Sequence, residues 1–174
     1  MGALLARFDL AEYRLCRRLN RGVEHAGIRM FFMAASRLGD GVIWYLLMLA
    51  LPFVYGAQGL RVALIMLASS AAGLAVYKML KRTFVRERPF IRHAGISLAG
   101  APLDRYSFPS GHTLHAVAFT WQACAAFPEL AVVLVPLALA IAASRVVLGL
   151  HYPTDVLVGA LLGAAFGVVG AWFT

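Results

Sequence analysis

The chain has 174 residues, of which 61% are hydrophobic and only 14% are charged, and its formal net charge is +8. A soluble domain carries about a quarter charged residues, so this composition excludes an ordinary soluble protein and indicates a single-domain membrane protein. The excess positive charge does not indicate nucleic-acid binding, because the basic residues flank apolar runs and suit anionic lipid surfaces or phosphorylated substrates better.

Residues 1–37 are predicted to form amphipathic helices at the membrane interface, ahead of a membrane-embedded unit at 38–174. Apolar residues such as Phe8 and Leu15 recur at helical spacing, while the arginines fall mainly elsewhere around the helix. That pattern is typical of a helix that lies in the interface rather than crossing it. Residues 28–36 are apolar but too short to span a bilayer, so we expect a second interfacial or half-inserted helix there.

Apolar runs in the rest of the chain predict about five membrane spans, at about 42–56, 60–80, 110–127, 129–148 and 154–173. The expected fold class is therefore an all-α, polytopic transmembrane helical bundle with an N-terminal amphipathic interfacial helix. Small residues at four-residue spacing in the last span are predicted to pack closely against another helix: Gly159, Gly163 and Gly167.

Polar residues interrupt the apolar pattern at three places. The long loop at 81–108 begins with Lys81 and contains Arg88, the third span opens with Ser110, Gly111 and His112, and Arg145, His151 and Asp155 join the last two spans. An even number of crossings separates these places, so the predicted topology gathers all three on one side of the membrane. Ionisable groups at membrane depth are costly and indicate a functional site.

The cations among these residues suit a phosphate. The side chains of Lys81, Arg88 and Arg145 can donate to phosphate oxygens, and an arginine fork fits a tetrahedral anion. Backbone N–H groups of Ser110 and Gly111 at a helix start add a further anion site. No carboxylate or Cys/His cluster has the spacing of metal ligands, so we expect no metal and no other cofactor.

The histidines supply the reactive groups. One of His112 and His151 can attack phosphorus and the other can protonate the leaving oxygen. Asp155, four residues after His151, could fix the tautomer of that ring and stabilise its cation. Taken singly, each motif could arise by chance, but their gathering on one side argues for a site. The remaining histidines and both cysteines are expected to be structural or without a role: His25, His93, His115, Cys16 and Cys124.

Read in order, Lys81-x6-Arg88-Pro89, Pro109-Ser110-Gly111-His112 and Ser144-Arg145-x5-His151-x3-Asp155 resemble the three-part signature of the type 2 phosphatidic acid phosphatase superfamily. The resemblance covers roughly residues 38–174. It implies a helical bundle and metal-independent phosphate-ester hydrolysis through a phosphohistidine. It makes His151 the nucleophile, His112 the general acid and Asp155 the partner of His151, and assigns the phosphate to Lys81, Arg88, Ser110, Gly111 and Arg145.

We therefore expect an integral-membrane lipid phosphatase that acts on the terminal phosphate of a polyprenyl diphosphate, phosphatidylglycerol phosphate or phosphatidic acid. The alternatives are a lipid phosphotransferase with the same site and a catalytically silent lipid-binding protein. Vanadium haloperoxidases resemble the signature too, but a chain of 18.8 kDa made mostly of spans argues against them. The expected partners are the bilayer and the lipid substrate, with no nucleic acid and no obligate protein partner.

The expected location is a bacterial-type inner (plasma) membrane. Basic residues concentrate on the side of the three motifs, which by the positive-inside rule favours a site facing the cytoplasm. Bacterial members of the resembling family commonly carry six spans and face the exterior. This chain differs from them because an Arg-rich amphipathic segment stands in place of their first span.

Overall fold

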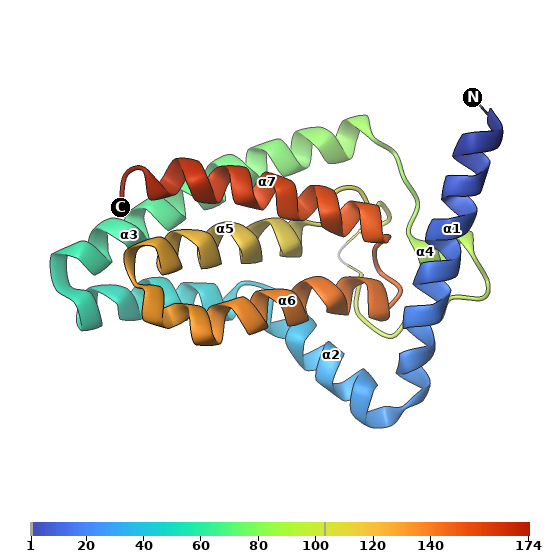
Figure 1. Ribbon diagram of the computed structural model, residues 1–174, viewed down its shortest axis with the longest axis horizontal. Coiled ribbons are helices and arrows are strands. Elements are labelled where there is room, and N and C mark those ends of the chain that lie inside the picture. The colour runs from blue at the N-terminus through green and yellow to red at the C-terminus, as the bar shows by residue number, and fades with distance from the viewer. Residues whose placement is uncertain (1, 103) are drawn as a thin grey trace.

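The computed structural model describes residues 2–102 and 104–174, and its regular structure is helical (Figure 1). The predicted segments 1–37 and 81–108 thus each include one residue, 1 and 103, that lies outside the described part. The helices are α1 (Gly2–Asn20), α2 (Ala26–Leu38), α3 (Val42–Thr83), α4 (Pro89–Arg92), α5 (Gly111–Ala126), α6 (Ala131–Val147) and α7 (Pro153–Ala171). Short 3-10 helices at Arg21–Glu24 and Pro128–Leu130 precede α2 and α6.

Helix α3 is a hairpin of two arms. Its 42 residues turn back at Gly56, whose φ of 60° and ψ of −135° are not helical and favour glycine. Beside the turn, a Cβ on Gly59 would lie 2.0 Å from the carbonyl oxygen of Leu51, so the close contact there also requires glycine. In Figure 1 the two arms, cyan and green, start from the turn at the left and diverge from each other. They correspond to the first two predicted spans.

The two arms of α3 together with α5, α6 and α7 form the bundle, which confirms the predicted all-α membrane fold. By length and composition, three helical stretches among the described residues can cross a membrane: Val42–Thr83, Pro128–Val147 and Pro153–Ala171. Helix α5 has 16 residues and lies inside the bundle, where it packs against α3, α6 and α7. A membrane of about 30 Å corresponds to about 20 helical residues, so α5 is the short central rod.

The most extensive helix contact joins α5 and α7, and the glycine stripe of α7 makes it. A Cβ on Gly159 would lie 2.5 Å from the carbonyl oxygen of Ser110, and one on Gly163 would lie 2.4 Å from that of Leu114. At Gly167 the Cβ would lie 2.5 Å from the Cβ of Trp121. The stripe therefore permits the close backbone approach predicted from its spacing. This approach brings the N-terminal ends of α5 and α7, and with them two of the polar motifs, together.

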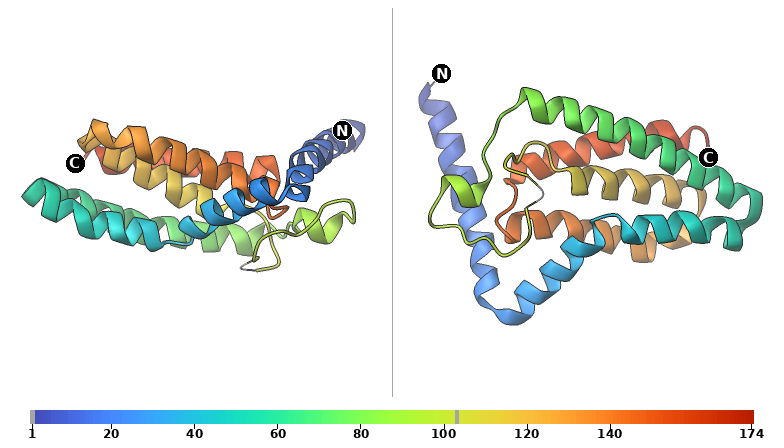
Figure 2. Two further views of the ribbon diagram at one scale, coloured as in Figure 1. Left: turned by 90° about the horizontal axis from the view of Figure 1, so that it is seen from below. Right: turned by 180° about the vertical axis from the view of Figure 1, so that it is seen from behind.

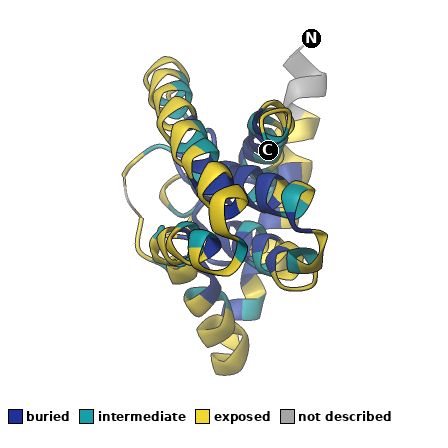
Figure 3. Ribbon diagram, turned by 90° about the vertical axis from the view of Figure 1, so that its left-hand side faces the viewer, coloured by how far each residue is buried: buried dark blue, intermediate teal, exposed yellow. Residues whose placement is uncertain are grey.

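The hydrophobic core lies between α3, α5 and α6, where Trp44 packs against Phe119 with ring centroids 5.5 Å apart. The outward faces of the bundle helices α3, α6 and α7 are apolar as well, including Phe53, Val132 and Leu161, and Figure 3 shows exposed residues along the outside of the helices. A bundle that is apolar on its outside suits a lipid surrounding.

Helix α1 runs across one end of the bundle, next to the loop that follows α3 (Figures 1 and 2). Its buried face is formed by Glu12, Cys16 and Asn20, spaced four residues apart, while Phe8 and Leu15 are exposed. Asn20 binds the loop and α6 through hydrogen bonds to both backbone groups of Ser97 and to the carbonyl of Val147. The apolar stripe predicted to face the membrane therefore points outward, and a polar stripe packs against the protein.

Candidate active site

The last motif forms a tight turn at the end of the bundle that α1 covers. After α6 the chain turns at Gly149, whose φ of +75° favours glycine. The N–H groups of Leu150 and His151 both donate to the carbonyl of Arg145, at 3.0 and 2.9 Å. This arrangement buries the His151 side chain beside the start of α7.

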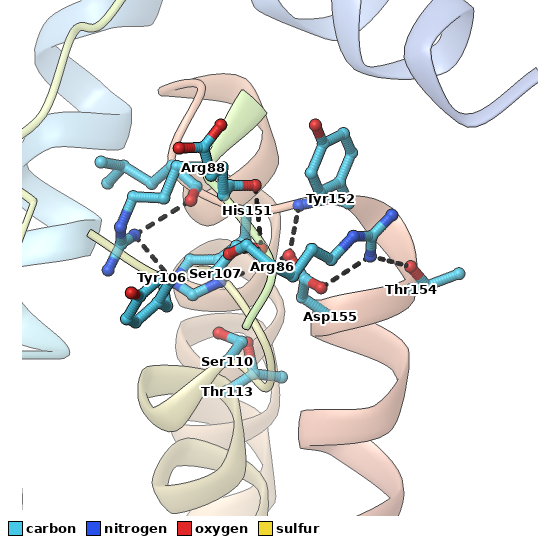
Figure 4. Close-up of polar contacts among 12 residues, drawn as sticks. Arg86, Arg88, Tyr106, Ser107, Ser110, Thr113, His151, Tyr152, Thr154 and Asp155 are labelled. Carbon is cyan, nitrogen blue, oxygen red and sulfur yellow. Dashed lines mark hydrogen bonds and ion pairs between the residues drawn. The ribbon is translucent and has the colours of Figure 1, made fainter. Parts of the chain in front are cut away.

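Arg88 lies directly against this histidine. Its guanidinium donates to the backbone carbonyls of Asp104 and Leu150, at 2.7 and 2.9 Å, and Nη1 lies 3.2 Å from His151 Nε2 (Figure 4). A guanidinium has no acceptor, so Nε2 must present its lone pair and the proton of a neutral ring must sit on Nδ1. The nitrogen with the lone pair therefore faces the arginine, as a nucleophile for a bound phosphate requires.

The electrostatic surroundings keep His151 neutral. Burial lowers the pKa of His151 to about 3, and the charges of Arg145 and Arg88 act in the same direction, while Asp155 opposes them. Only the unprotonated ring is a nucleophile. At neutral pH the imidazole is therefore in its reactive form.

Asp155 is near the histidine but makes no hydrogen bond to it. Helix α7 begins at Pro153, and His151 Nδ1 lies 3.7 Å from Asp155 Oδ2. That oxygen accepts a hydrogen bond of 2.8 Å from the Tyr152 N–H, as part of a capping box at the helix start. His151 Nδ1 has no partner among the described residues, so a small rotation of the ring would close the bond.

Lys81 and Arg88 share one carboxylate at the rim of the site. Lys81 Nζ lies 2.6 Å from Asp104 Oδ2, and Arg88 Nη2 lies 3.1 Å from Oδ1. Burial disfavours the ionised carboxylate, but the hydrogen bond from Lys81 and the nearby arginine outweigh burial and hold the pKa of Asp104 below its ordinary value. Tyr77 donates a hydrogen bond of 3.3 Å to the same carboxylate.

The second motif opens α5 beside these groups. The Ser110 N–H donates to the Asp155 carbonyl at 3.0 Å, which joins the starts of α5 and α7. His112 Nε2 lies 2.7 Å from Asp40 Oδ1. Because an ionised carboxylate only accepts, the proton of this histidine sits on Nε2, where it is held ready for transfer. Gly111 packs against the Tyr77 ring, and the Tyr77 hydroxyl accepts a hydrogen bond from Lys81 Nζ.

Arg145 is the most isolated cation of the site. Its side chain is 1% exposed, its Nη1 donates to the Ser36 hydroxyl, and its Nε has no partner among the described residues. No carboxylate within the described part of the chain lies within salt-bridge distance of it. A buried charge without a counterion is costly, and buried guanidinium groups are normally paired. Arg145 is therefore a buried cation of the site that has no ion-pair partner among the described residues.

A cavity of about 300 Å³ leads from His112 into the bundle. Asp40, Tyr77 and Gly111 line its polar end. Apolar side chains from α3 and α5 line much of the rest, together with Ser70 and His115: Trp44, Met48, Leu74 and Phe119. Its walls thus combine polar groups with apolar side chains, as a site for an amphiphilic molecule requires.

Residues 59–174 match the family model of the PAP2 superfamily. The chain belongs to the PAP2 superfamily. The decaprenylphosphoryl-5-phosphoribose phosphatase of Mycobacterium tuberculosis is 32% identical over 149 residues, which cover 84% of this chain and 81% of that protein. The lipid A 1-phosphatase of Rhizobium johnstonii is 35% identical over 97 residues, which cover 53% of this chain but only 40% of that protein.

Two solved PAP2-like structures share the architecture. Aquifex aeolicus LpxE superposes with a TM-score of 0.80 at 26% identity, covering 92% of this chain and 94% of that chain. A PAP2-type phosphatidylglycerolphosphate phosphatase from Bacillus subtilis superposes with a TM-score of 0.74 over 96% of this chain and 86% of that one. At 22% identity the second likeness shows the fold alone. The relatives are phosphatases, which identifies this PAP2 chain as a member of a family of membrane lipid phosphatases.

The structure thus places the residues predicted from the three signature motifs around one end of the PAP2 bundle, and it adds polar residues that the motifs do not contain. Asp40 contacts His112, Asp104 contacts two cations, and Ser36 contacts Arg145. Glu12 and Arg86 contact the start of α7. One signal could have found the acids: the chain has only eight Asp and Glu residues, so each carboxylate in an apolar sequence merits a role.

Proposed function

We propose that this protein hydrolyses the terminal phosphate of a membrane lipid, with His151 as the nucleophile that forms a phosphohistidine. The observation that carries the proposal is the buried guanidinium of Arg145, which has no carboxylate partner among the described residues and whose charge acts on His151. A phosphate bound between Arg145 and Arg88 would supply the missing counterion and lie against the lone pair of His151 Nε2. Because the Ser110 N–H already binds the Asp155 carbonyl, the backbone donors from the start of α5 would begin with the N–H of Gly111.

The proposed reaction has two steps. In the first, His151 Nε2 attacks phosphorus, the bond to the lipid oxygen breaks, and His112, as the imidazolium paired with Asp40, gives that oxygen its Nε2 proton and becomes neutral. In the second, water attacks the phosphohistidine, the P–N bond breaks, and the water proton returns to His112. Asp155 would accept a hydrogen bond from Nδ1 of His151 as the ring becomes cationic.

Cationic side chains would stabilise the charge of the transition state without a metal. Lys81, Arg88 and Arg145 come from three different segments and converge on one end of the bundle, where little water competes for them. Lys81 and Arg88 currently share Asp104, which lies at the rim and is partly exposed. When a phosphate binds, Lys81 and Arg88 would donate hydrogen bonds to its oxygens.

The substrate class follows from the cavity and from the relatives. The apolar walls between α3 and α5 can take the first part of a lipid chain while its headgroup stays near His112. The mycobacterial relative is named for a decaprenyl-linked phosphoribose substrate, so we place a polyprenyl-linked phosphate or diphosphate first. Phosphatidic acid, phosphatidylglycerol phosphate and lipid A 1-phosphate are the competing substrates of the same chemical class.

Release of inorganic phosphate from these lipids by the purified protein in detergent tests the proposal. We expect turnover of at least one substrate, no turnover by His151→Ala, and severely slowed turnover by His112→Ala. The loss in His112→Ala should shrink for substrates with a good leaving group, because these need less protonation. Near-normal phosphate release by His151→Ala would refute the phosphohistidine. Transfer of phosphate to a second lipid in place of water would favour a phosphotransferase.

We further propose that the site faces the cytoplasm across the plasma membrane. Helix α1 and the loop after α3 lie at the same end as the site, and together they hold eight of the sixteen Lys and Arg residues of the chain (Figure 1). At the other end, near the turn of α3, stands Arg61. The positive-inside rule supports this orientation.

A further inference from the structure

Glu12 is a buried carboxylate that α1 brings to the start of another helix. Its side chain is 4% exposed, and its Oε1 accepts a hydrogen bond of 3.0 Å from the Thr154 N–H and another from the Thr154 hydroxyl. The first N–H groups of a helix have no partner within that helix, so Glu12 satisfies one of these donors of α7 from outside. The contact bridges residues far apart in the sequence and docks α1 on α7.

Arg86 connects this carboxylate to Asp155. Its Nη2 donates to Glu12, while Nη1 donates to Asp155 Oδ1 at 2.8 Å and to the Thr154 hydroxyl at 2.7 Å (Figure 4). The guanidinium also lies over the Tyr152 ring, 3.9 Å from its centroid. The arginine is thus held on several sides and has a fixed geometry.

These contacts determine how Asp155 presents itself to His151. One oxygen of the fully buried carboxylate is bound by the Tyr152 N–H and the other by Arg86, so the plane of the carboxylate is fixed by two donors. In this orientation Asp155 Oδ2 lies 3.7 Å from His151 Nδ1. Without Arg86 the Asp155 carboxylate would keep only the hydrogen bond from the Tyr152 N–H and could rotate about its Cβ–Cγ bond.

We propose that Glu12 and Arg86 are positioning residues that orient Asp155 toward His151. Helix α1 would then contribute to catalysis through Glu12. The proposal rests on the proposed phosphatase function. Arg86 does not serve as a phosphate ligand in this arrangement, because one terminal nitrogen is bound to Glu12 of α1 and the other to the fully buried Asp155 of α7. The phosphate cradle of Lys81, Arg88 and Arg145 should therefore survive the loss of Arg86.

The charged groups around Asp155 define the sign of the expected pH effect. Arg86 faces it from the loop, His151 from the preceding turn, and Glu12 from α1 through Arg86. The Cys16 thiol of α1 is also near, but burial, followed by Glu12 and Asp155, raises its pKa to about 12 and keeps it neutral. Removing the Arg86 cation leaves the full charge of Asp155 to act on His151, which favours the protonated imidazole.

The test compares kcat, KM and pH profiles of the full-length protein carrying Arg86→Gln, Glu12→Gln or both. We expect Arg86→Gln to lower kcat by at least about 10-fold with KM within about 2-fold, and to move the acid limb of kcat/KM upward by at least about half a pH unit. Glu12→Gln should lower kcat less and leave that limb unmoved or lower. The double variant should lose little more activity than Arg86→Gln alone, because the two residues act through one contact.

A second ion pair between the same segments provides the matched control. Arg92 of the loop lies 3.9 Å from Asp9 of α1, and both side chains are more than half exposed. Arg92→Gln and Asp9→Asn should keep wild-type kcat and pH dependence. Thermal stabilisation by orthovanadate, which reports an intact cradle, should persist in Arg86→Gln and thereby separates misplacement of Asp155 from unfolding.

Each outcome decides between the two proposals. A raised KM with unchanged kcat in Arg86→Gln would make Arg86 a phosphate ligand and overturn the positioning role. So would a pH profile identical to that of Arg92→Gln, or additive losses in the double variant. If Arg86→Gln loses its response to orthovanadate, Arg86→Lys, which keeps the charge, replaces it and must restore part of kcat. Failure of the wild-type protein to release phosphate from any lipid would instead refute the proposed function.

Discussion

Replacing Arg145 with methionine should make the protein more stable and less active. The guanidinium is 1% exposed and has no carboxylate partner among the described residues, so its burial opposes folding. Methionine fills similar space without a charge. The substitution therefore separates the free-energy cost of burying the cation from its use in binding a phosphate.

The magnitude follows from two opposing contributions. Replacing buried ionic groups with apolar side chains stabilises a protein by about 1–4 kcal/mol, and losing the hydrogen bond to Ser36 costs about 1 kcal/mol. For a chain of this size, about 1 kcal/mol corresponds to about 2–4 °C in Tm, so we expect a rise of up to about 10 °C. Losing a charge-assisted contact of about 3 kcal/mol in the transition state should slow turnover by about 150-fold.

Thermal unfolding in detergent, followed by tryptophan fluorescence with and without orthovanadate, measures both effects. At about 100 times its Kd, orthovanadate should stabilise the wild-type protein by about 2.7 kcal/mol and the methionine variant far less. Arg61→Met, at an exposed position near the turn of α3, is the control and should respond like wild type. An Arg145→Met variant that melts well below wild type, or that orthovanadate stabilises equally, would refute the reasoning.

Four further results are expected. Arg88→Lys should lose at least about 10-fold in kcat/KM, because lysine keeps the charge but not the planar fork, and wild-type kinetics would remove Arg88 from the cradle. EDTA should leave phosphate release intact, whereas restoration of a chelated, inactive sample by Mg²⁺ would contradict the metal-free mechanism. Asp40→Asn should slow turnover chiefly with poor leaving groups, since an amide no longer holds the His112 proton at Nε2, and an equal effect on all substrates would argue against this role. In a protein with Cys16 and Cys124 replaced, a membrane-impermeant maleimide applied to intact cells should label Gln58→Cys and not Ala94→Cys, and the reverse pattern would place the site outside.

The end of the bundle at which the motifs meet could be predicted because helix counting fixes sidedness. Each apolar run moves the chain across once, so Lys81, Ser110 and Arg145 had to return to one side whatever the details of packing. The glycine stripe of α7 was also readable, since small residues at four-residue spacing have few uses other than close helix contact. Periodicity and composition carry this information along a single helix.

Contacts between segments distant in the sequence were not predictable in the same way. The apolar face of α1 was recognised from its spacing, but the pattern does not say that the protein packs on Glu12, Cys16 and Asn20. A polar stripe on an interfacial helix ordinarily faces water. Here its partners, Arg86 and Ser97, lie in a loop whose path no periodic pattern describes.

Counting charges at the site explains why an anion, rather than any lipid, would complete it. Glu12 and Asp155 are both bound by Arg86, and Asp104 is shared by Lys81 and Arg88. These three carboxylates form ion pairs with Lys81, Arg86 and Arg88. Arg145 is then the buried cation without an ion-pair partner among the described residues. A neutral lipid headgroup would leave that charge uncompensated, whereas a phosphate would satisfy it and gain charge-assisted hydrogen bonds in a region of low dielectric. The same unpaired buried charge that opposes folding therefore selects a phosphorylated ligand.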